Sequence, residues 1–190
     1  ATPNGWKVSI TLEELGLEYR VHHIHLDQKE QKADWYVKLN PNGRIPTLEI
    51  EPGKFLAESN AILFYLAEGT PFLSTDRWER AQVLQWMFFE QYSHEPYIAT
   101  SRFWLQHKPD TPERSAVLAA RRDGGWAALK VMEEHLAKND FFVGDYTIAD
   151  IALFAYTHVS HEGGFTLVEF PKIRGWVERV KAQPGFIPMS

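Results

Sequence analysis

Two residue pairs between Asn40 and Leu66 have types and spacing that suit the binding of a small peptide. Glu58-Ser59 directly precedes a helix-like run, where unpaired N–H groups and the positive end of the helix dipole attract a carboxylate. The Ser59 hydroxyl could add a hydrogen bond, and Glu58 could bind an ammonium group, so the pair suits the head group of an α-amino acid. Ile45-Pro46 opens a strand-like run. If this bond is cis, we expect the Ile45 backbone groups to pair with a peptide laid alongside as an extra strand.

Each pair also has a simpler interpretation. Pro46 could be trans and merely begin an edge strand. Glu58-Ser59 could cap the helix and do nothing more. The order and spacing of the two pairs within one short stretch favour the peptide-binding interpretation.

The elements that must position these pairs form a small α/β part at the start of the chain. Apolar spacing and turn residues predict its elements. They are a helix-like run over Trp6–Gly16, a strand over Tyr19–Asp27, a short helix over Gln31–Asn40, a hairpin of Pro46–Ile50 and Lys54–Ala57 around Glu51-Pro52-Gly53, and a helix over Glu58–Gly69.

The pattern after Thr75 is helical almost throughout. We predict a long helix over Asp76–His107 kinked near Pro96, a second over Pro112–Lys138, a third from Thr147 and a fourth over Pro171–Ala182. The predicted domains are therefore 1–69 and 76–190, joined by a linker at 70–75.

Thr147 and Asp150 have the spacing of a helix capping box, with Tyr146 and Ile151 as a hydrophobic staple. This local pattern already satisfies the carboxylate, so we assign Asp150 a structural role.

Composition excludes several classes of function. The chain has 190 residues, a net charge of −5 and no cluster of basic residues, so binding to nucleic acid through charge is not expected. No apolar run approaches the roughly 18 residues of a membrane span, and no signal-peptide pattern is present, so we predict a cytoplasmic protein. With 0 cysteines, any thiol chemistry must use a thiol carried by the ligand. No cluster of carboxylates lies beside His22, His23 and His25 in the sequence, and we expect exposed strand histidines rather than a metal site.

Three motifs resemble the cytosolic glutathione transferase family. "NPNGRIPTLE…FLAESNAILFYLAE" resembles its glutathione-binding half, and "VGDYTIADIALF" resembles the capping box of its helical domain. "TPNGWKVSITLEELGLEYR" resembles the first helix of the Nu class and of the yeast nitrogen-regulator relatives. The resemblance covers essentially the whole chain. It implies a thioredoxin-like α/β domain followed by an all-α domain, glutathione as co-substrate, no metal, and a homodimer.

The resemblance also implies roles for individual residues. Thr2 and Asn4 would stabilise the glutathione thiolate, although without the resemblance simple helix capping would be the preferred interpretation. Glutathione contacts would come from Gln31, Arg44, Ile45, Pro46, Glu58 and Ser59. The second substrate site would include Tyr92, His94 and Arg102.

Two activities fit these roles, namely conjugation of glutathione to an electrophile and reduction of a disulfide with glutathione. A non-catalytic regulatory or stress protein on the same fold is the alternative. Family members begin with a strand before the motif found here at Thr2, so we expect residues upstream of Ala1, where a catalytic Tyr or Ser could lie.

Overall fold

The computed structural model of the chain describes residues 2–189, which form two compact units. The first unit runs to Glu68 and includes the stretch that begins at Pro184, and the second is Gly69–Gln183. The chain end therefore belongs with the first unit, which differs from the predicted helical domain at 76–190.

The reason lies in contacts of the first helix with this last stretch. The Trp6 indole N–H donates to the Ile187 carbonyl at 3.0 Å, and the Trp6 and Phe186 rings meet edge to face at 5.9 Å. A Cβ built on Gly185 would lie 2.6 Å from the Glu14 Cα, so this glycine lies directly against the helix backbone.

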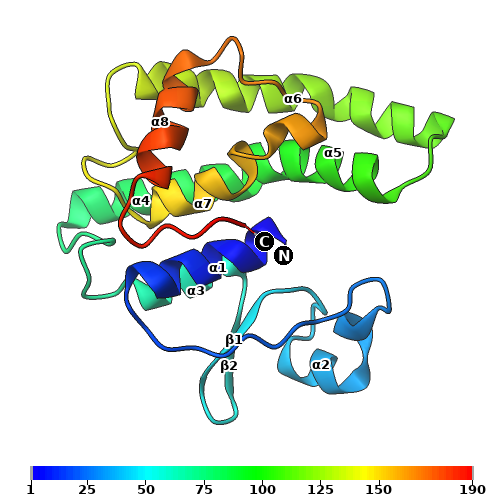
Figure 1. The fold of residues 1–190 in the computed structure, drawn as a ribbon, viewed down its shortest axis with the longest axis vertical. Helices are drawn as coiled ribbons and strands as arrows, with labels where there is room; N and C mark the ends of the chain where they lie inside the picture. Colours follow the sequence, from blue (N-terminus) through cyan, green and yellow to red (C-terminus); the bar gives the residue numbers. More distant parts are fainter. Residues whose placement is uncertain (1, 190) are drawn as a thin grey trace. The chain divides into compact units, whose positions relative to one another are not determined.

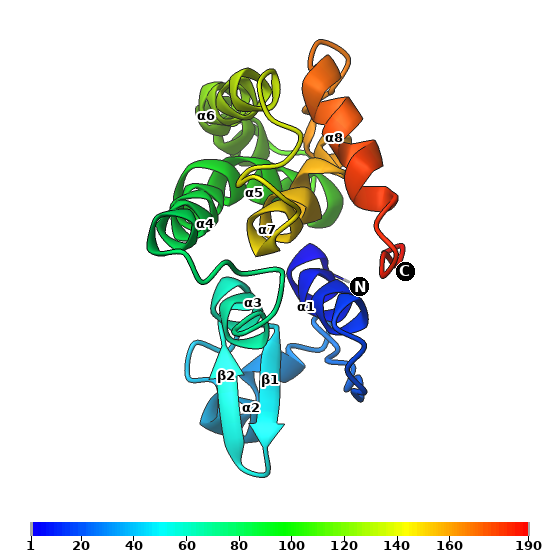
Figure 2. The same cartoon turned by 90° about the vertical axis from the view of Figure 1, so that its left-hand side faces the viewer.

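The first unit combines a hairpin with short helices (Figure 1). Its elements are α1 (Pro3–Glu14), the 3₁₀ turn η1 (Glu30–Lys32), α2 (Asp34–Leu39), β1 (Thr47–Glu51), β2 (Lys54–Ala57) and α3 (Ser59–Leu66). Its core lies between α1 and α3, which run side by side in both views (Figure 2). Ile10 of α1 and Ile62 and Leu63 of α3 have no exposed surface there.

Helix α1 has well-defined ends that the sequence encodes. Thr2 is its N-cap and Pro3 occupies the first turn, where the missing N–H is not needed. At the other end Gly16 adopts a φ of 63°, its N–H donates to the Glu13 carbonyl at 3.0 Å, and the Leu17 N–H donates to the Leu12 carbonyl at 3.0 Å. This pair of bonds is a Schellman motif, which explains why the helix stops at the glycine.

The predicted hairpin is confirmed. Strands β1 and β2 pair antiparallel, with Thr47 opposite Ala57 and an irregularity between Glu49 and Glu51. Gly53 takes a φ of 79° in the turn, a conformation that glycine adopts readily.

The predicted strand over Tyr19–Asp27 is wrong. This segment forms no β-ladder, and most of its side chains are exposed, including Val21 at 59% and Leu26 at 39%. A strand requires a hydrogen-bonding neighbour, and among residues 2–189 the sheet has only two strands, which pair with each other. Residue composition favoured a strand but could not supply the pairing partner, and Leu26 and Asp27 lie in a turn.

The second unit is helical. It contains α4 (Arg77–Phe89), the π-helical turn η2 (Glu90–His94), α5 (Glu95–His107), α6 (Pro112–Leu136), α7 (Ile148–Thr157), the 3₁₀ turn η3 (Ser160–Gly163) and α8 (Pro171–Lys181). Helices α5 and α6 pack side by side (Figure 1). The predicted helix over Asp76–His107 is thus one run interrupted by η2. Pro96 lies in the first turn of α5, just past the interruption, where its missing N–H leaves the helical bonding incomplete.

Every residue of α7 is buried, and the predicted capping box begins it. The Asp150 carboxylate accepts hydrogen bonds from the Thr147 backbone N–H at 3.0 Å, the Phe142 N–H at 3.2 Å and the Trp176 indole at 2.8 Å. Burial raises the pKa of Asp150 to about 6, against the opposing effect of these hydrogen bonds. The carboxylate therefore joins three segments of the helical core, and its role is structural.

Within residues 2–189, no helix has the length and apolar character needed to span a membrane.

Candidate functional site

The hairpin register brings the two residue pairs together. Because Thr47 lies opposite Ala57, the residue before β1 and the residue after β2 leave the ladder at the same end. These residues are Pro46 and Glu58, so the pairs separated by a dozen positions in sequence become neighbours. The Ile45–Pro46 peptide bond is cis, as the peptide-binding interpretation required.

A buried polar cluster fixes the loop before Pro46. The Arg44 carbonyl accepts hydrogen bonds from the Tyr36 hydroxyl at 2.7 Å and from the Asn40 side-chain amide at 2.8 Å. The Tyr36 hydroxyl is also 2.9 Å from the Thr47 hydroxyl. Sequence reasoning missed Tyr36 and Asn40; the only signal was the pair of turn-forming asparagines around Pro41.

Helix α3 begins without a side-chain cap. Its first backbone bond runs from the Ile62 N–H to the Glu58 carbonyl at 3.0 Å. The earlier N–H groups in the first turn of α3 therefore have no carbonyl partner within the helix. The interpretation of Glu58-Ser59 as a plain cap therefore has no hydrogen bond to support it. These N–H groups and the positive end of the helix dipole form a place for a carboxylate.

Glu58 has an unusual backbone, with φ 67° and ψ 110°. Such values are rare for residues other than glycine and cost energy. Its carboxylate is exposed and accepts a long hydrogen bond from the Asn42 side-chain amide at 3.4 Å. The strained backbone holds a negative charge beside the start of α3, where a ligand ammonium could meet it.

The starts of α1 and α3 also meet. The Ser59 hydroxyl donates to the Asn4 amide oxygen at 3.3 Å, and the Thr2 hydroxyl oxygen accepts from the Gly5 N–H at 3.2 Å. Two positive helix ends therefore face one region, which favours anions there. The single Ser59 proton is engaged with Asn4, so in this conformation the backbone N–H groups of α3, rather than the Ser59 hydroxyl, are the donors for a ligand carboxylate.

Gln31 and Arg44 lie near the same loop. A Cβ on Gly43 would be 2.8 Å from the Gln31 carbonyl oxygen, which shows how closely η1 approaches the loop. The Gln31 side-chain oxygen is buried and accepts no hydrogen bond within residues 2–189. The Arg44 side chain is exposed.

The three residues predicted for a second substrate do not converge. Tyr92 is 84% exposed, whereas His94 is fully buried. The Arg102 guanidinium is paired with the Glu162 carboxylate. The prediction that His94 lines a cleft is wrong for this structure, because the π-helical turn η2 directs the ring into the core. There its Nε2 lies 3.0 Å from the Thr157 hydroxyl, whose own proton goes to the Leu153 carbonyl at 2.7 Å, so the histidine Nε2 is the donor.

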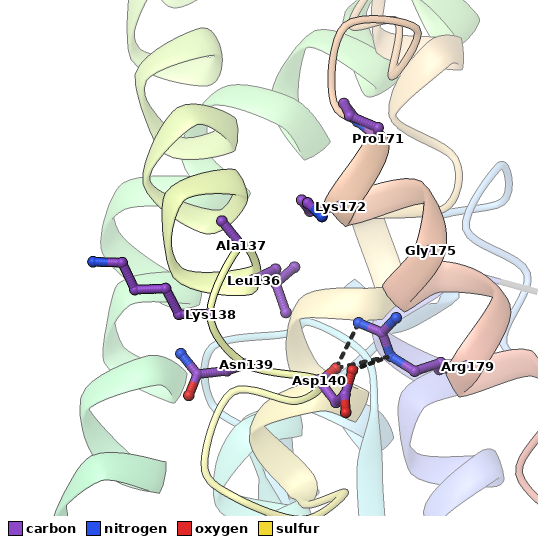
Figure 3. A pocket seen from close by; sticks show the side chains of 9 residues that line it. All are labelled: Leu136, Ala137, Lys138, Asn139, Asp140, Pro171, Lys172, Gly175 and Arg179. Carbon is purple, nitrogen blue, oxygen red and sulfur yellow. Dashed lines mark hydrogen bonds and ion pairs between the residues drawn. The ribbon is translucent and has the colours of Figure 1, made fainter.

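A hollow of about 480 Å³ lies between the end of α6 and helix α8 (Figure 3). Its charged lining includes Lys138, Lys172 and the pair Arg179–Asp140, in which the guanidinium donates to the Asp140 carbonyl at 2.8 Å. No residue predicted for the site lines it. The start of α8 is already capped, because the Glu133 carboxylate accepts from the Lys172 N–H at 3.0 Å.

Across residues 2–189, no group of three or more His, Asp or Glu side chains is placed to hold a metal ion. His22, His23 and His25 are exposed.

Comparison with known families assigns the chain to one of them. The family model described as "Glutathione S-transferase, N-terminal domain" matches residues 1–68, and "Glutathione S-transferase, C-terminal domain" matches residues 86–184. The chain therefore belongs to the glutathione S-transferase family.

Two curated relatives differ in how much of their length the chain spans. The chain is 31% identical to the disulfide-bond oxidoreductase YfcG of Escherichia coli over 196 residues, covering 97% of this chain and 88% of that protein. It is 31% identical to the protein URE2 of Eremothecium gossypii over 228 residues, covering 98% of this chain but 64% of that protein. The chain thus spans less than two thirds of this URE2 relative.

Solved structures share the fold. A glutathione S-transferase from Pseudomonas fluorescens has a TM-score of 0.95 and 45% identity, covering 98% of this chain and 94% of that one. A glutathione transferase from Pseudomonas putida, solved with one glutathione disulfide bound per subunit, has a TM-score of 0.86 and 31% identity, covering 97% of this chain and 85% of that one.

Proposed function

We propose that this protein binds glutathione where the starts of α1 and α3 meet, and uses its thiolate to attack an electrophile or a disulfide. The observation that carries the proposal is the Ser59–Asn4 hydrogen bond, which joins the two helix starts beside the Glu58 carboxylate. The relative that is a disulfide-bond oxidoreductase, and the related structure that holds glutathione disulfide, support the same ligand.

The γ-glutamyl end of glutathione carries an ammonium and a carboxylate. The Glu58 carboxylate suits the ammonium, and the uncapped backbone N–H groups of α3 suit the carboxylate. The peptide backbone would lie beside Ile45 and Pro46. The glycine carboxylate would pair with Arg44, and the buried Gln31 oxygen would accept a hydrogen bond from a peptide N–H.

The thiol then lies near the start of α1. A free thiol is mostly protonated at neutral pH, and hydrogen bonds that favour the anion lower its pKa. The Thr2 hydroxyl uses its oxygen to cap Gly5, which leaves its proton for donation to a thiolate. The Asn4 bond to Ser59 uses the amide oxygen, so the amide nitrogen is the donor end of that side chain.

The thiolate can react in two ways. In conjugation its sulfur forms a bond to an electrophilic carbon and a leaving group departs with the bonding electrons. In disulfide reduction it attacks one sulfur of the substrate, the S–S bond breaks, and the departing thiolate takes a proton; a second glutathione resolves the mixed disulfide. The chain has 0 cysteines, so both routes rely on thiols of glutathione.

A non-catalytic glutathione-binding regulator is the second candidate. One observation favours it: the chain is 30% identical over 229 residues to the transcriptional regulator URE2 of Saccharomyces cerevisiae. Turnover of a model disulfide and of a chlorinated nitroarene separates the candidates, because a regulator would bind glutathione and turn over neither.

Homodimer formation is part of the proposal. Helix α4 and the turn η2 carry an exposed aromatic face, with Trp78 at 70%, Phe88 at 69% and Tyr92 at 84% exposure. Large aromatic side chains arranged along one helical run typify association surfaces. We propose that a second copy covers this face, and that the protein works in the cytoplasm.

Calorimetric titration with glutathione and with glutathione disulfide tests the proposed site. We expect saturable binding that Glu58→Ala weakens strongly, because it removes the carboxylate proposed for the ammonium. Ser59→Ala should also weaken binding, because it removes the bond to Asn4 that joins the two helix starts. The control is Glu51→Ala, which removes an exposed carboxylate of the same unit that pairs with Lys54 at 3.5 Å. If a folded protein binds neither form, or if the control variant loses as much affinity as Glu58→Ala, the proposed site is wrong.

A further inference from the structure

A lysine is buried in the first helix of the first unit. Lys7 of α1 has 0% of its surface exposed, and among residues 2–189 it is the only buried lysine or arginine. Lysine is almost never fully buried unless its ammonium has a partner, because removing the charge from water is costly. The position of this ammonium therefore needs an explanation.

The ammonium lies against the start of α3. The Lys7 Nζ donates to the Asn60 side-chain oxygen at 3.2 Å, and Asn60 is the second residue of that helix. Helices α1 and α3 pack side by side (Figure 2). One turn further along α1, the buried Thr11 hydroxyl donates to the Lys7 carbonyl at 2.8 Å. Lys7 therefore joins the two helices from within their packed face.

This contact is next to the one that joins the two helix starts. Asn4 and Lys7 are three positions apart in α1, so their side chains share one face of the helix. Their partners in α3, Ser59 and Asn60, are consecutive residues. The ammonium therefore lies about one helical turn from the place where the proposed function puts the glutathione thiol.

Helix packing alone does not account for a lysine at this position. Replacement of a buried charged group by a well-packed apolar one is often neutral or stabilising, so an uncharged side chain could join α1 to α3 at less cost. What the ammonium adds is a positive charge. Because this charge is removed from water, its attraction for a nearby anion is screened less than that of a surface lysine.

Within the first unit, the elements that pack on α1 bring few other charges to this point. The carboxylates of α1 itself, Glu13 and Glu14, lie nearly two turns further along. The only titratable side chain within α3 is Tyr65, which is 48% exposed, and residues 184–189 have none. Glu58 precedes α3, and its carboxylate is exposed. The ammonium and the two helix starts therefore favour an anion at the same place.

We propose that the Lys7 ammonium, held in place by Asn60, stabilises the glutathione thiolate by its charge; this inference rests on the proposed function. Thr2 and Asn4 supply the hydrogen bonds to the sulfur, and Lys7 lies behind them without touching it. Its charge adds to that of the positive ends of α1 and α3. A larger share of the bound glutathione is then in the reactive thiolate form at neutral pH.

The test measures the pKa of the bound glutathione thiol in the whole protein, from the ultraviolet absorbance of the thiolate as pH is raised. Lys7→Met removes the charge and keeps a long apolar side chain, and we expect it to raise this pKa by about one unit. Lys7→Arg keeps the charge and should keep the parent value. The control Lys54→Met removes a lysine of the same unit whose side chain is 64% exposed, and it should change nothing.

Calorimetric titration with S-methylglutathione separates this role from simple packing, because this ligand has no thiol to ionise. We expect every variant to bind it with the parent affinity. If Lys7→Met weakens S-methylglutathione and glutathione equally, Lys7 only maintains the shape of the site and the proposal is wrong. An unchanged thiol pKa in a Lys7→Met protein that still binds glutathione would also refute it.

Asn60→Asp provides a second test in case Lys7→Met does not fold. It sets a carboxylate against the ammonium and so neutralises the charge of the pair, and acidic residues suit the start of a helix. We expect the thiol pKa to rise here too, and an unchanged value would overturn the proposal. Failure of the proposed function looks different: the parent protein itself would bind neither glutathione nor S-methylglutathione, and the role of Lys7 would be refuted with it.

Discussion

The backbone of Glu58 makes stability and ligand affinity change in opposite directions on substitution. A residue held in such a sparsely populated region costs roughly 1–3 kcal/mol. Glycine would relieve this cost, offset by roughly 0.5–1 kcal/mol for its greater freedom in the unfolded chain. Glu58→Gly should therefore stabilise the protein by about 1 kcal/mol, which raises the Tm by about 2–4 °C for a chain of this size.

The same substitution removes the carboxylate proposed to bind the glutathione ammonium. A hydrogen bond to a charged group contributes about 1.5–3 kcal/mol, so affinity should fall roughly 10- to 150-fold. Glu58→Ala separates the two effects, since it removes the carboxylate but keeps a side chain on the strained backbone. We expect equal affinity losses in the two variants and a higher Tm in the glycine variant alone.

Thermal unfolding and calorimetric titration of the parent protein and both variants provide the assay. If the glycine variant is no more stable than the alanine variant, the backbone at Glu58 is not strained in solution. If either variant keeps the parent affinity for glutathione, the carboxylate does not hold the ammonium, and the proposed orientation of the ligand is wrong.

Three further predictions concern the helical unit. Burial raises the Asp150 pKa from 3.8 to about 6, so the folded state binds this proton more tightly than the unfolded state. The free energy of unfolding should therefore fall by up to about 3 kcal/mol as pH rises from about 4 to above 6. Asp150→Asn should abolish this pH dependence, and parallel pH–stability curves for the variant and the parent protein would contradict it. Gly125→Ala should destabilise the protein by about 1–2 kcal/mol, because the new Cβ would lie 2.3 Å from the Phe165 ring. Gly175→Ala should stabilise it slightly, because the new Cβ meets only the flexible end of Arg179 at 3.4 Å. Chemical denaturation that ranks the two variants the other way would refute this packing. Phe88→Glu should convert the proposed homodimer to a monomer in sedimentation analysis, and an unchanged mass would exclude this face as the interface.

Local sequence signals predicted the elements whose determinants are contained within them. The hairpin followed from its turn residues, α7 from the Thr147–Asp150 box, and the end of α1 from Gly16. In each case the hydrogen bonds that define the element join residues at most about ten positions apart, so a short stretch of sequence is sufficient to predict it.

Features that depend on distant partners were predicted poorly. The Tyr19–Asp27 segment has strand-like composition but no pairing neighbour among residues 2–189. The direction of His94 depends on the π-helical turn and on Thr157, which lies 63 positions away. That Glu58 and Pro46 are neighbours in space follows only from the hairpin register. The hydrogen bond between Ser59 and Asn4 joins residues 55 positions apart, so local sequence could not predict it.

The contact of the chain end with α1 has a consequence for synthesis. Because the Ile187 carbonyl and the Phe186 ring pack on Trp6, the first unit is completed by residues that leave the ribosome after the whole helical unit. A nascent chain arrested before Pro184 would expose the Trp6 indole with its N–H unbonded to this carbonyl. The α/β unit, although translated first, is therefore the one that reaches its final packing last.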